Sequence, residues 1–490
     1  MLPAMIWAPA ASAHRRNLTL AVALLITLAG FALRFYRLSN QSLWTDEVSS
    51  ITTARLPLSQ ITEHSAAVNN SLPTYFLLLR AAMGKSNEDI EFRARWLSAL
   101  AGALSVPLLI GVVYLWRRRC SAALLAGLLL AINPLHLWYS QEARAYALML
   151  LFGLLTLLAY ELARQSRRPG WWGLYFLSAL AAVALHKTGL VFPAACALWH
   201  GWEVRREKRR LRELTVVAVT LAAVFGVLLL KSHPPPPEYG RPSSILEIGY
   251  TFMTFVGGYS FGPSLTEIQS QGALGAVSRH RVQVGELGAV LLLLGLAYAF
   301  QWRRLVRGKE TGLLVLSVGL VALAALISSF PYNIRYTLPA LVAFVALAAA
   351  LEHGAGRRRV ACLAIAGMLL VGAWADVQWF NCAAYRKGDS RAVAQWLVAH
   401  QAQVKSWTVL PDYLGDSIEW YLQPYPKVLA GKEPPAHAQT TSFPPVPDVL
   451  ILGRRHHIKD PDKLIAAYCA RAGAVRTNLS LAGFELYVRE

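Results

Sequence analysis

The sequence predicts an α-helical polytopic membrane protein with about eleven transmembrane helices, outer interfacial helices and a small C-terminal extramembrane α/β domain. Three observations indicate this. A hydrophobic share of 55% and a mean hydropathy of +0.38 over 490 residues exceed what a soluble domain usually carries. Apolar runs alternate with short basic blocks, and the composition becomes that of a soluble protein near residue 381. We therefore expect two domains, 1–380 and 381–490.

The apolar runs supply the predicted spans. Crossing about 30 Å of hydrocarbon takes roughly 17 to 25 residues. Segments near or at this length lie at 18–34, 94–116, 121–138, 145–163, 171–186, 188–202, 214–231, 285–302, 311–329, 336–351 and 360–378. The first is long and has no small-residue cleavage site after it, so we expect it to be retained rather than removed as a signal peptide.

The basic blocks predict the orientation. They fall at every second connection, as expected for cytoplasmic loops. The blocks are Arg15–Arg16, Arg117–Arg119, Arg164 with Arg167–Arg168, Arg205–Arg212, Arg303–Lys309 and Arg357–Arg359. This places the N-terminus in the cytoplasm and the C-terminal domain outside an inner (plasma) membrane. The basic residues behind the formal charge of +20 lie largely in these short blocks between apolar runs, not on one basic face or in a basic tail. This distribution argues against nucleic acid as a partner.

Two long outer loops, 35–93 and 232–284, separate the spans. Interfacial helices are expected around 46–51 and after residue 58 in the first loop. The apolar stretch 72–79 is too short to cross and is predicted to be re-entrant or to pack against its neighbours. The second loop begins with a proline run, and its remainder is either a lid over a site or a structural cap.

The C-terminal segment reads as an α/β unit. A helical pattern covers 390–400, and β-like runs lie at 407–410, 449–452 and 484–488. No glycine-rich nucleotide loop is evident, so no nucleotide cofactor is expected. Cys382 and Cys469 are predicted to share the outer compartment, where they either form a disulfide or stay free. For the domain itself, acceptor recognition and structural support both remain open.

Polar groups gather on the predicted outer face. Charged groups at membrane depth usually face a cavity or pair with each other. Four loops contribute such groups, and the residues of interest are Trp44, Asp46, Glu47, Tyr139, Glu142, Arg144, His186, Lys187, Arg335 and Tyr336. Taken singly, each has a plain structural reading, such as a solvated loop, a Glu142–Arg144 pair or an interfacial anchor. Their coincidence on one face favours a functional site.

These groups suit group transfer from a lipid phosphate. Asp46 and Glu47 can supply a general base, or ligate a divalent metal cation, which would act chiefly through Asp46. Arg144, Lys187 and Arg335 can hold a phosphate as it leaves. We hypothesise a glycosyltransferase that uses a polyprenyl-phosphate sugar donor and an extracytoplasmic acceptor. The alternative is a transporter or flippase of envelope lipids or glycans, although no repeated halves are seen and the charges lie at span ends.

The motifs also resemble a known family, the C-class integral-membrane glycosyltransferases. Within it, the chain looks most like the bacterial branch related to protein O-mannosyltransferases and the lipid A aminoarabinose transferase. The resemblance covers about residues 18–380 and is carried by LRFYRL at 33–38, WTDE at 44–47, NP at 133–134, YSQEARAY at 139–146, HKTGL at 186–190 and RYTLP at 335–339.

The resemblance implies a polyprenyl-phosphate sugar donor and inversion at the anomeric carbon. It also implies that the first-loop acid, Asp46, is the catalytic or metal-binding carboxylate, with Glu47 beside it. Trp44, Tyr139, Glu142, His186 and Tyr336 are expected to support the site. The stretch 71–75 keeps the proline and tyrosine of the family but lacks the histidine often found before them, so no role of that histidine is carried over.

Overall fold

The structure is a computed structural model, and most of the chain is helical. It describes residues 13–67, 72–166, 168–205, 211–229, 245–264, 267–268, 275–327, 332–353, 358–433, 446–453, 458, 460–473, 475–481 and 483–489. The predicted proline-rich start of the loop 232–284 and Ser71 lie outside these residues.

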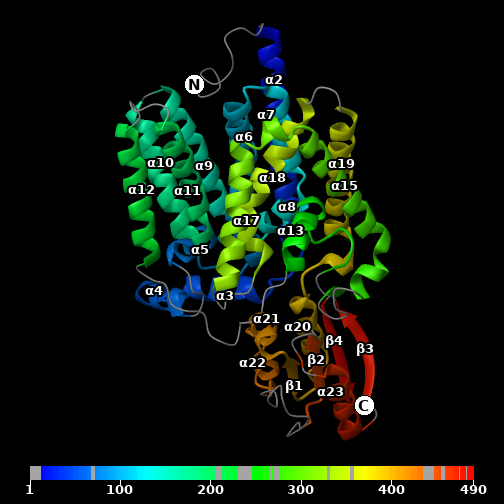
Figure 1. Ribbon diagram of the computed structural model, residues 1–490. Helices are drawn as coiled ribbons and strands as arrows, with labels where there is room; N and C mark the ends of the chain where they lie inside the picture. Colours follow the sequence, from blue (N-terminus) through cyan, green and yellow to red (C-terminus); the bar gives the residue numbers. More distant parts are fainter. Residues whose placement is uncertain are drawn as a thin grey trace.

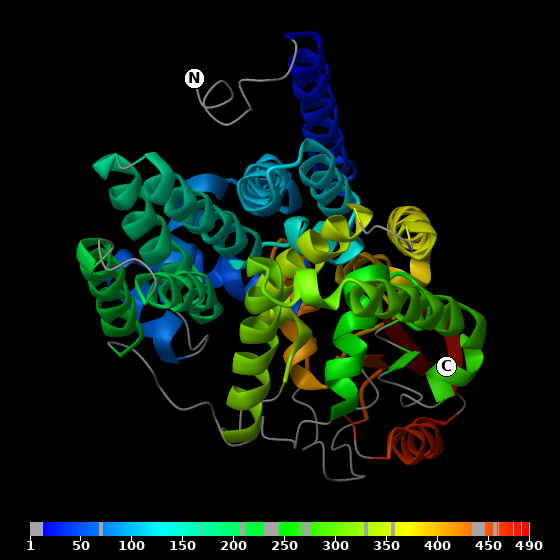
Figure 2. The ribbon, with the colours of Figure 1, turned by 45° about the horizontal axis from the view of Figure 1, so that its top comes forward.

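Long helices run side by side through the first four fifths of the chain (Figure 1). They are α2 (Ala13–Phe35), α6 (Ile90–Arg117), α7 (Cys120–Ala131), α8 (Pro134–Ser140), α9 (Tyr146–Ser166), α10 (Pro169–Leu185), α11 (Val191–Val204), α12 (Leu211–Leu229), α15 (Arg281–Phe300), α17 (Lys309–Ile327), α18 (Leu338–Ala350) and α19 (Arg358–Asn381). In both views α9–α12 group on one side, while α15 and α19 pair on the other (Figures 1 and 2).

Each predicted span coincides with one of these helices, with α7 and α8 sharing one span. Among the described residues, six helices are long and apolar enough to cross a membrane: α2, α6, α9, α12, α15 and α19. The bent pair α7 and α8 makes up to seven. The fold is thus that of a multi-pass membrane protein, and the count of eleven stays a prediction.

The break between α7 and α8 helps to place the site. The two helices meet at 58°. The side chain of Asn133 accepts a hydrogen bond from the amide of His136 at 2.9 Å, and Pro134 occupies the first helical position, so a new helix begins here. Because α8 is only seven residues long, the loop 141–145 follows it directly and reaches the first outer loop.

Shorter helices cross the ends of the long ones. They include α3 (Thr45–Arg55), α4 (Leu58–Ala67), α5 (Thr74–Met83), α13 (Ile245–Gly257) and α16 (Trp302–Leu305), with the 3₁₀ turns η1 (Lys187–Leu190), η4 (Ile334–Thr337), η5 (Leu351–His353) and η6 (Ala383–Tyr385). Helices α3 and α4 lie where interfacial helices were expected (Figure 1). As predicted, the apolar stretch in α5 packs against its neighbours, burying Tyr75, Phe76 and Leu79 against α3 and α6.

The basic connections meet at one end of the bundle. Arg117 pairs with Glu310, and Lys309 pairs with Glu161. Arg164 contacts both Glu161, at 3.2 Å, and Glu203. These residues come from the ends of four helices, α6, α9, α11 and α17. Helix α3 and the C-terminal segment lie at the opposite end (Figure 1). The basic connections and the acidic residues of α3 are therefore at opposite ends of the bundle, as the sequence pattern predicts.

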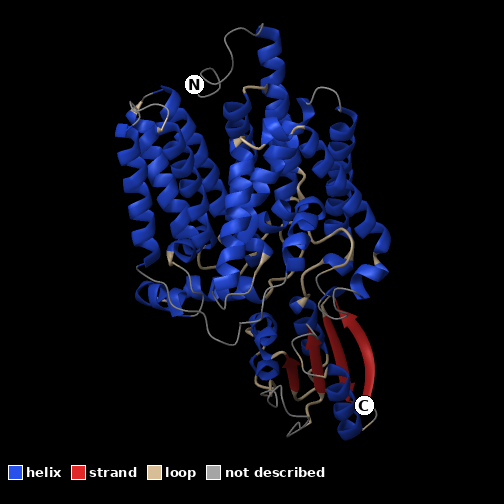
Figure 3. Ribbon diagram, viewed as in Figure 1, coloured by secondary structure: helices blue, strands red, loops and turns tan. Residues whose placement is uncertain are grey.

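The strands are confined to the C-terminal segment (Figure 3). This segment contains α20 (Ser390–Ala399), β1 (Trp407–Leu410), η7 (Asp412–Leu414), α21 (Gly415–Leu422), α22 (Pro426–Leu429), β2 (Val449–Gly453), α23 (Pro461–Ala472), β3 (Val475–Leu481) and β4 (Phe484–Arg489). The sheet order is β1-β2-β4-β3, with β1 and β2 parallel and the other pairs antiparallel.

Strand β2 is buried on both faces, which explains its continuous apolar run. Val449 and Ile451 pack with the side chains of α20 and α21, whereas Leu450 and Leu452 pack with Leu464 of α23. The segment therefore has a core on each side of its sheet. Cys382 and Cys469 are both free thiols, so the disulfide considered between them is not formed.

Candidate active site

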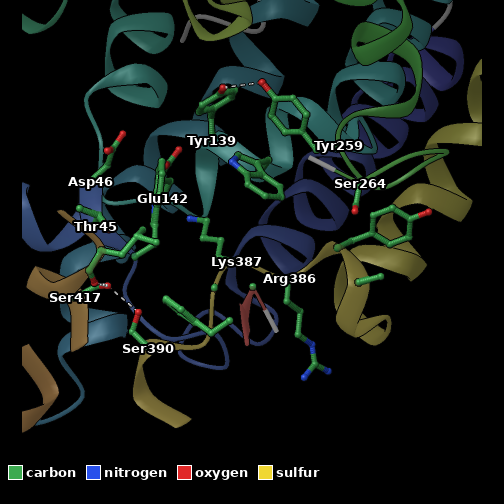
Figure 4. A pocket seen from close by; sticks show the side chains of 18 of the residues that line it. Thr45, Asp46, Tyr139, Glu142, Tyr259, Ser264, Arg386, Lys387, Ser390 and Ser417 are labelled. Carbon is green, nitrogen blue, oxygen red and sulfur yellow. Dashed lines mark hydrogen bonds between the residues drawn. The ribbon is translucent and has the colours of Figure 1, made fainter. Parts of the chain in front are cut away.

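A cavity of about 330 Å³ lies between the helices and the C-terminal segment. Figure 4 shows this cavity from close by. Stretches far apart in the sequence line it: Trp44, Thr45, Asp46, Trp138, Tyr139, Glu142, Tyr259, Ser264, Asn333, Arg335, Ala384, Tyr385, Arg386, Lys387, Gly388, Ser390, Leu414, Ser417, Gly483 and Phe484. Of the ten residues predicted from the sequence, five lie here: Trp44, Asp46, Tyr139, Glu142 and Arg335.

Asp46 and Arg335 form an ion pair at the wall of this cavity. The Nη1 atom of Arg335 lies 3.0 Å from Oδ2 of Asp46, and both side chains stay partly exposed, at 26% and 30%. Asp46 sits in the first turn of α3, where the helix dipole favours a negative charge. Arg335 is positioned by η4, because the Asn333 side chain accepts a hydrogen bond from its amide at 3.1 Å. Two residues 289 positions apart thus meet, where the sequence predicts only that they share the outer face.

Glu47 points away from the cavity, unlike the sequence-based expectation. Its carboxylate is fully buried and receives two hydrogen bonds of 2.7 Å from the guanidinium of Arg95. The amide of Ala143 donates a third bond at 3.0 Å, and the amide of Trp44 a longer one at 3.4 Å. Burial alone would raise the pKa of Glu47, but the charges of Arg95 and Lys387 and these hydrogen bonds lower it to about 2. These contacts tie the first turn of α3 to α6 and to the loop after α8.

Glu142 does line the cavity. It is 1% exposed, and within the described part of the chain its Oε2 atom has no hydrogen-bond partner. Burial raises the pKa of Glu142, Lys387 partly offsets this, and the carboxylates of Glu47 and Asp46 add to it. Glu142 therefore binds a proton more readily than an exposed glutamate does.

Aromatic rings form much of the remaining wall. The Tyr139 and Tyr259 hydroxyls are 3.1 Å apart, and the Trp138 ring meets the Tyr259 ring edge-on at a centroid distance of 5.1 Å. Aromatic faces and hydroxyls together suit a ligand with both apolar and polar surfaces.

The other predicted residues lie behind this wall and not on it. Arg144 donates to Oγ of Ser50 at 3.1 Å. His186 stacks on Tyr336 at 5.6 Å between ring centroids, and the guanidinium of Arg335 lies 5.4 Å from the centroid of the Tyr336 ring. Lys187 is partly buried in η1 and is not among the lining residues. Tyr336 and His186 thus pack behind Arg335, whereas Arg144 contacts α3 through Ser50.

Sequence reasoning missed three residues of the site. Arg95 was read only as the start of a span, although a charge inside an apolar helix is itself a signal. Tyr259 lies in the aromatic run of the second outer loop, which the sequence left open as a lid or a cap. Lys387 comes from the linker after α19 and enters the cavity from the C-terminal side. No spacing rule connects it with Asp46.

The described residues do not fit a divalent metal site. No cluster of three or more His, Cys, Asp or Glu side chains occurs among them. Oδ2 of Asp46 is bound by Arg335, and the cations around it would repel a metal ion. We derive no step through a metal, and the role of Asp46 as a metal ligand stays a sequence-based prediction.

The chain has recognisable relatives. Residues 73–230, about a third of the chain, match the family described as dolichyl-phosphate-mannose-protein mannosyltransferase. No curated protein sequence gives a significant match. The fold is similar to that of the apo oligosaccharyltransferase of Archaeoglobus fulgidus, with a TM-score of 0.50 and 15% identity over 94% of this chain and 65% of that chain.

A second solved structure is ArnT from Cupriavidus metallidurans bound to undecaprenyl phosphate, with a TM-score of 0.46 and 12% identity over 98% of this chain and 99% of that chain. The chain thus spans nearly all of ArnT but less than two thirds of the archaeal oligosaccharyltransferase. The family match over residues 73–230 and the fold shared with the archaeal oligosaccharyltransferase agree with the resemblance to C-class integral-membrane glycosyltransferases that the motifs at 44–47 and 139–146 carry.

Proposed function

We propose that this protein is a membrane glycosyltransferase that moves a sugar from a polyprenyl-phosphate donor to an extracytoplasmic lipid, glycan or protein, with inversion. The observation that carries the proposal is the Asp46–Arg335 pair, which joins a carboxylate and a phosphate-binding cation in one aromatic cavity. The family description over residues 73–230, which names a dolichyl-phosphate sugar, supports a lipid-phosphate donor.

In the proposed reaction Asp46 is the general base. It takes the proton of the acceptor hydroxyl or amine while the acceptor attacks the anomeric carbon from the side opposite the phosphate. The bond between the anomeric carbon and the phosphate oxygen breaks, and its electron pair leaves with the lipid phosphate. Arg335 binds this phosphate and stabilises the charge that develops on it.

The ion pair itself suggests an order of events. Before the donor binds, Arg335 holds Asp46 at 3.0 Å. A donor phosphate competes for the same guanidinium and releases the carboxylate to act on the acceptor. Glu142, whose pKa is raised, is suited to donate a hydrogen bond in its protonated form. We propose that Glu47 holds the first turn of α3 in place. Arg144 and Lys187 contribute positive electrostatic potential near the cavity without contacting the phosphate.

The proposal includes an orientation in the membrane, with the cavity outside and the paired basic connections inside an inner (plasma) membrane. Reconstituted protein supplied with radiolabelled polyprenyl-phosphate sugars tests the whole proposal. Sugar appearing on an acceptor extract from envelope membranes supports it. Movement of the intact labelled lipid between leaflets without sugar transfer would instead identify a flippase. If neither sugar transfer nor lipid movement is observed, the enzyme assignment is unsupported.

A further inference from the structure

Hydrogen bonds between the backbone around Lys387 and the first outer loop hold this residue at the cavity. Its amide donates a hydrogen bond to Oε1 of Gln41 at 3.1 Å, and Oγ of Ser42 donates to the carbonyl of Gly388 at 3.0 Å. The linker after α19 is thereby fixed against the first outer loop. The side chain of Lys387 points into the pocket toward Glu142, while that of Arg386 points away (Figure 4).

The ammonium group of Lys387 is buried without using its donors. Its side chain is 3% exposed, and Nζ lies 3.7 Å from Oε2 of Glu47. It also lies 5.7 Å and 5.6 Å from the ring centroids of Trp44 and Trp138. Within the described residues it has no hydrogen-bond partner. A buried cation in this state is costly unless an anion with hydrogen-bond acceptors reaches it.

Glu47 does not fill that need, because its Oε2 atom lies 3.7 Å from Nζ of Lys387, beyond hydrogen-bond distance, and its oxygens already accept hydrogen bonds from Arg95 and the amide of Ala143. Apart from Arg386, which points away from the cavity, and Lys187, which does not line it, four cations face three carboxylates in and directly behind the cavity, which leaves a surplus of positive charge when all are ionised. They are Arg95, Arg144, Arg335 and Lys387 against Asp46, Glu47 and Glu142.

We propose that Lys387 binds a phosphate oxyanion of a substrate in this cavity, so that the C-terminal segment supplies a binding residue of the site. The phosphate belongs either to the polyprenyl-phosphate donor or to a phosphorylated acceptor. This inference rests on the proposed function. It also gives the C-terminal segment a definite role, since the linker that carries Lys387 joins α19 to α20.

Binding to the purified full-length chain tests the inference without requiring catalysis. The variants are Lys387→Gln, Lys387→Arg and, as a matched control, Lys427→Gln, which removes the same charge from an exposed position of α22. The two probes are undecaprenyl phosphate and inorganic phosphate. We expect Lys387→Gln to bind a probe about ten- to a hundredfold more weakly, since hydrogen bonds to charged groups contribute that much. Lys387→Arg and Lys427→Gln should stay near wild type.

Each outcome decides between the sources. Weakened binding of undecaprenyl phosphate, with or without inorganic phosphate, assigns Lys387 to the donor. Weakened binding of inorganic phosphate alone assigns it to an acceptor phosphate. Unchanged affinity for both, with a lowered melting temperature, would make Lys387 only a structural counter-ion of Glu47 and overturn the inference. Because no turnover is measured, a failure of the proposed enzyme activity is seen separately.

A wild-type measurement covers the case in which Lys387→Gln does not accumulate. Reductive methylation of lysines, followed by peptide mapping, should show that one of the two probes protects Lys387 and leaves Lys427 unprotected. Equal labelling of Lys387 with and without both probes would contradict the inference.

Discussion

Asp46 and Glu47 are neighbours in one helical turn, and each is paired with an arginine, yet the two pairs are built differently. The Asp46–Arg335 pair has a contact of 3.0 Å and is partly open to a cavity. The Glu47–Arg95 pair has two contacts of 2.7 Å and is closed to solvent. The first can exchange its partner for a substrate, and the second cannot without leaving a buried charge unpaired.

The difference shows that two adjacent acidic residues in one helical turn have different roles: one faces the cavity, and the other holds the helix in place. Helix geometry turns adjacent side chains about 100° apart, so only one of them can face the cavity. Asp46 takes that position, while Glu47 fixes the turn to α6 through Arg95 and to the loop after α8 through Ala143. Changes at the two positions should therefore give different phenotypes.

The largest expected effect is on turnover in Asp46→Asn. Loss of a general base reduces the rate by about 10² to 10⁴, and because the side chain is partly exposed and of equal size, the melting temperature should stay near wild type. Sugar transfer by reconstituted protein measures the rate. The matched control is Glu88→Gln, an exposed carboxylate of the same outer loop. Wild-type turnover in Asp46→Asn would remove the base assignment.

Glu47→Gln should act on stability instead. It leaves the guanidinium of Arg95 buried without the carboxylate that binds it, which costs about 3 to 5 kcal/mol. Thermal unfolding of the purified protein measures this, and the double variant Glu47→Met/Arg95→Met should recover part of the loss. A Glu47→Gln protein that melts like wild type but transfers no sugar would show that Glu47 takes part in the chemistry.

Arg335→Gln should weaken donor use by about ten- to a hundredfold, because a charge-assisted contact to phosphate is lost. The apparent donor requirement in the transfer assay measures this. Lys187→Gln provides the comparison, since Lys187 is partly exposed and does not line the cavity, and a change of at most about threefold is expected. A larger effect at Lys187 than at Arg335 would mean that the phosphate binds elsewhere.

The smallest effect concerns pH. The pKa of Glu47 is lowered to about 2, so its contribution to stability is present above about pH 4.5 and is lost as the pH falls toward 2. The pKa of Glu142 is raised, so the stability linked to its protonated form is present at low pH and is lost as the pH rises through that raised value.

Glu142→Gln should therefore melt above wild type at neutral pH, and the difference should vanish as the pH falls below about 4.5. Melting temperatures across this range measure it. A difference that does not depend on pH would mean that ionisation of Glu142 carries no cost in the folded protein.

Much of this arrangement follows from the sequence, because apolar length and basic blocks are local signals. Helices α3 and α4, the buried α5 and the strands at 407, 449 and 484 appear where the patterns place them. The sequence places Asp46 and Arg335 on the same outer face but does not predict that they form an ion pair. Lys387 was missed, since its neighbour Glu47 lies 340 residues away and nothing local records that contact. The orientation of Glu47 depends on the rotation of α3, which Arg95 fixes.

The central claim is that the lining of the cavity lies on one side of the membrane, opposite the basic connections. Single cysteines at Thr45, Asn333 and Arg119 in a cysteine-free background, treated with a membrane-impermeant maleimide on intact spheroplasts, test it most directly. The account predicts labelling at positions 45 and 333 before lysis and at position 119 only after lysis. Labelling of 45 and 333 from opposite sides would contradict it.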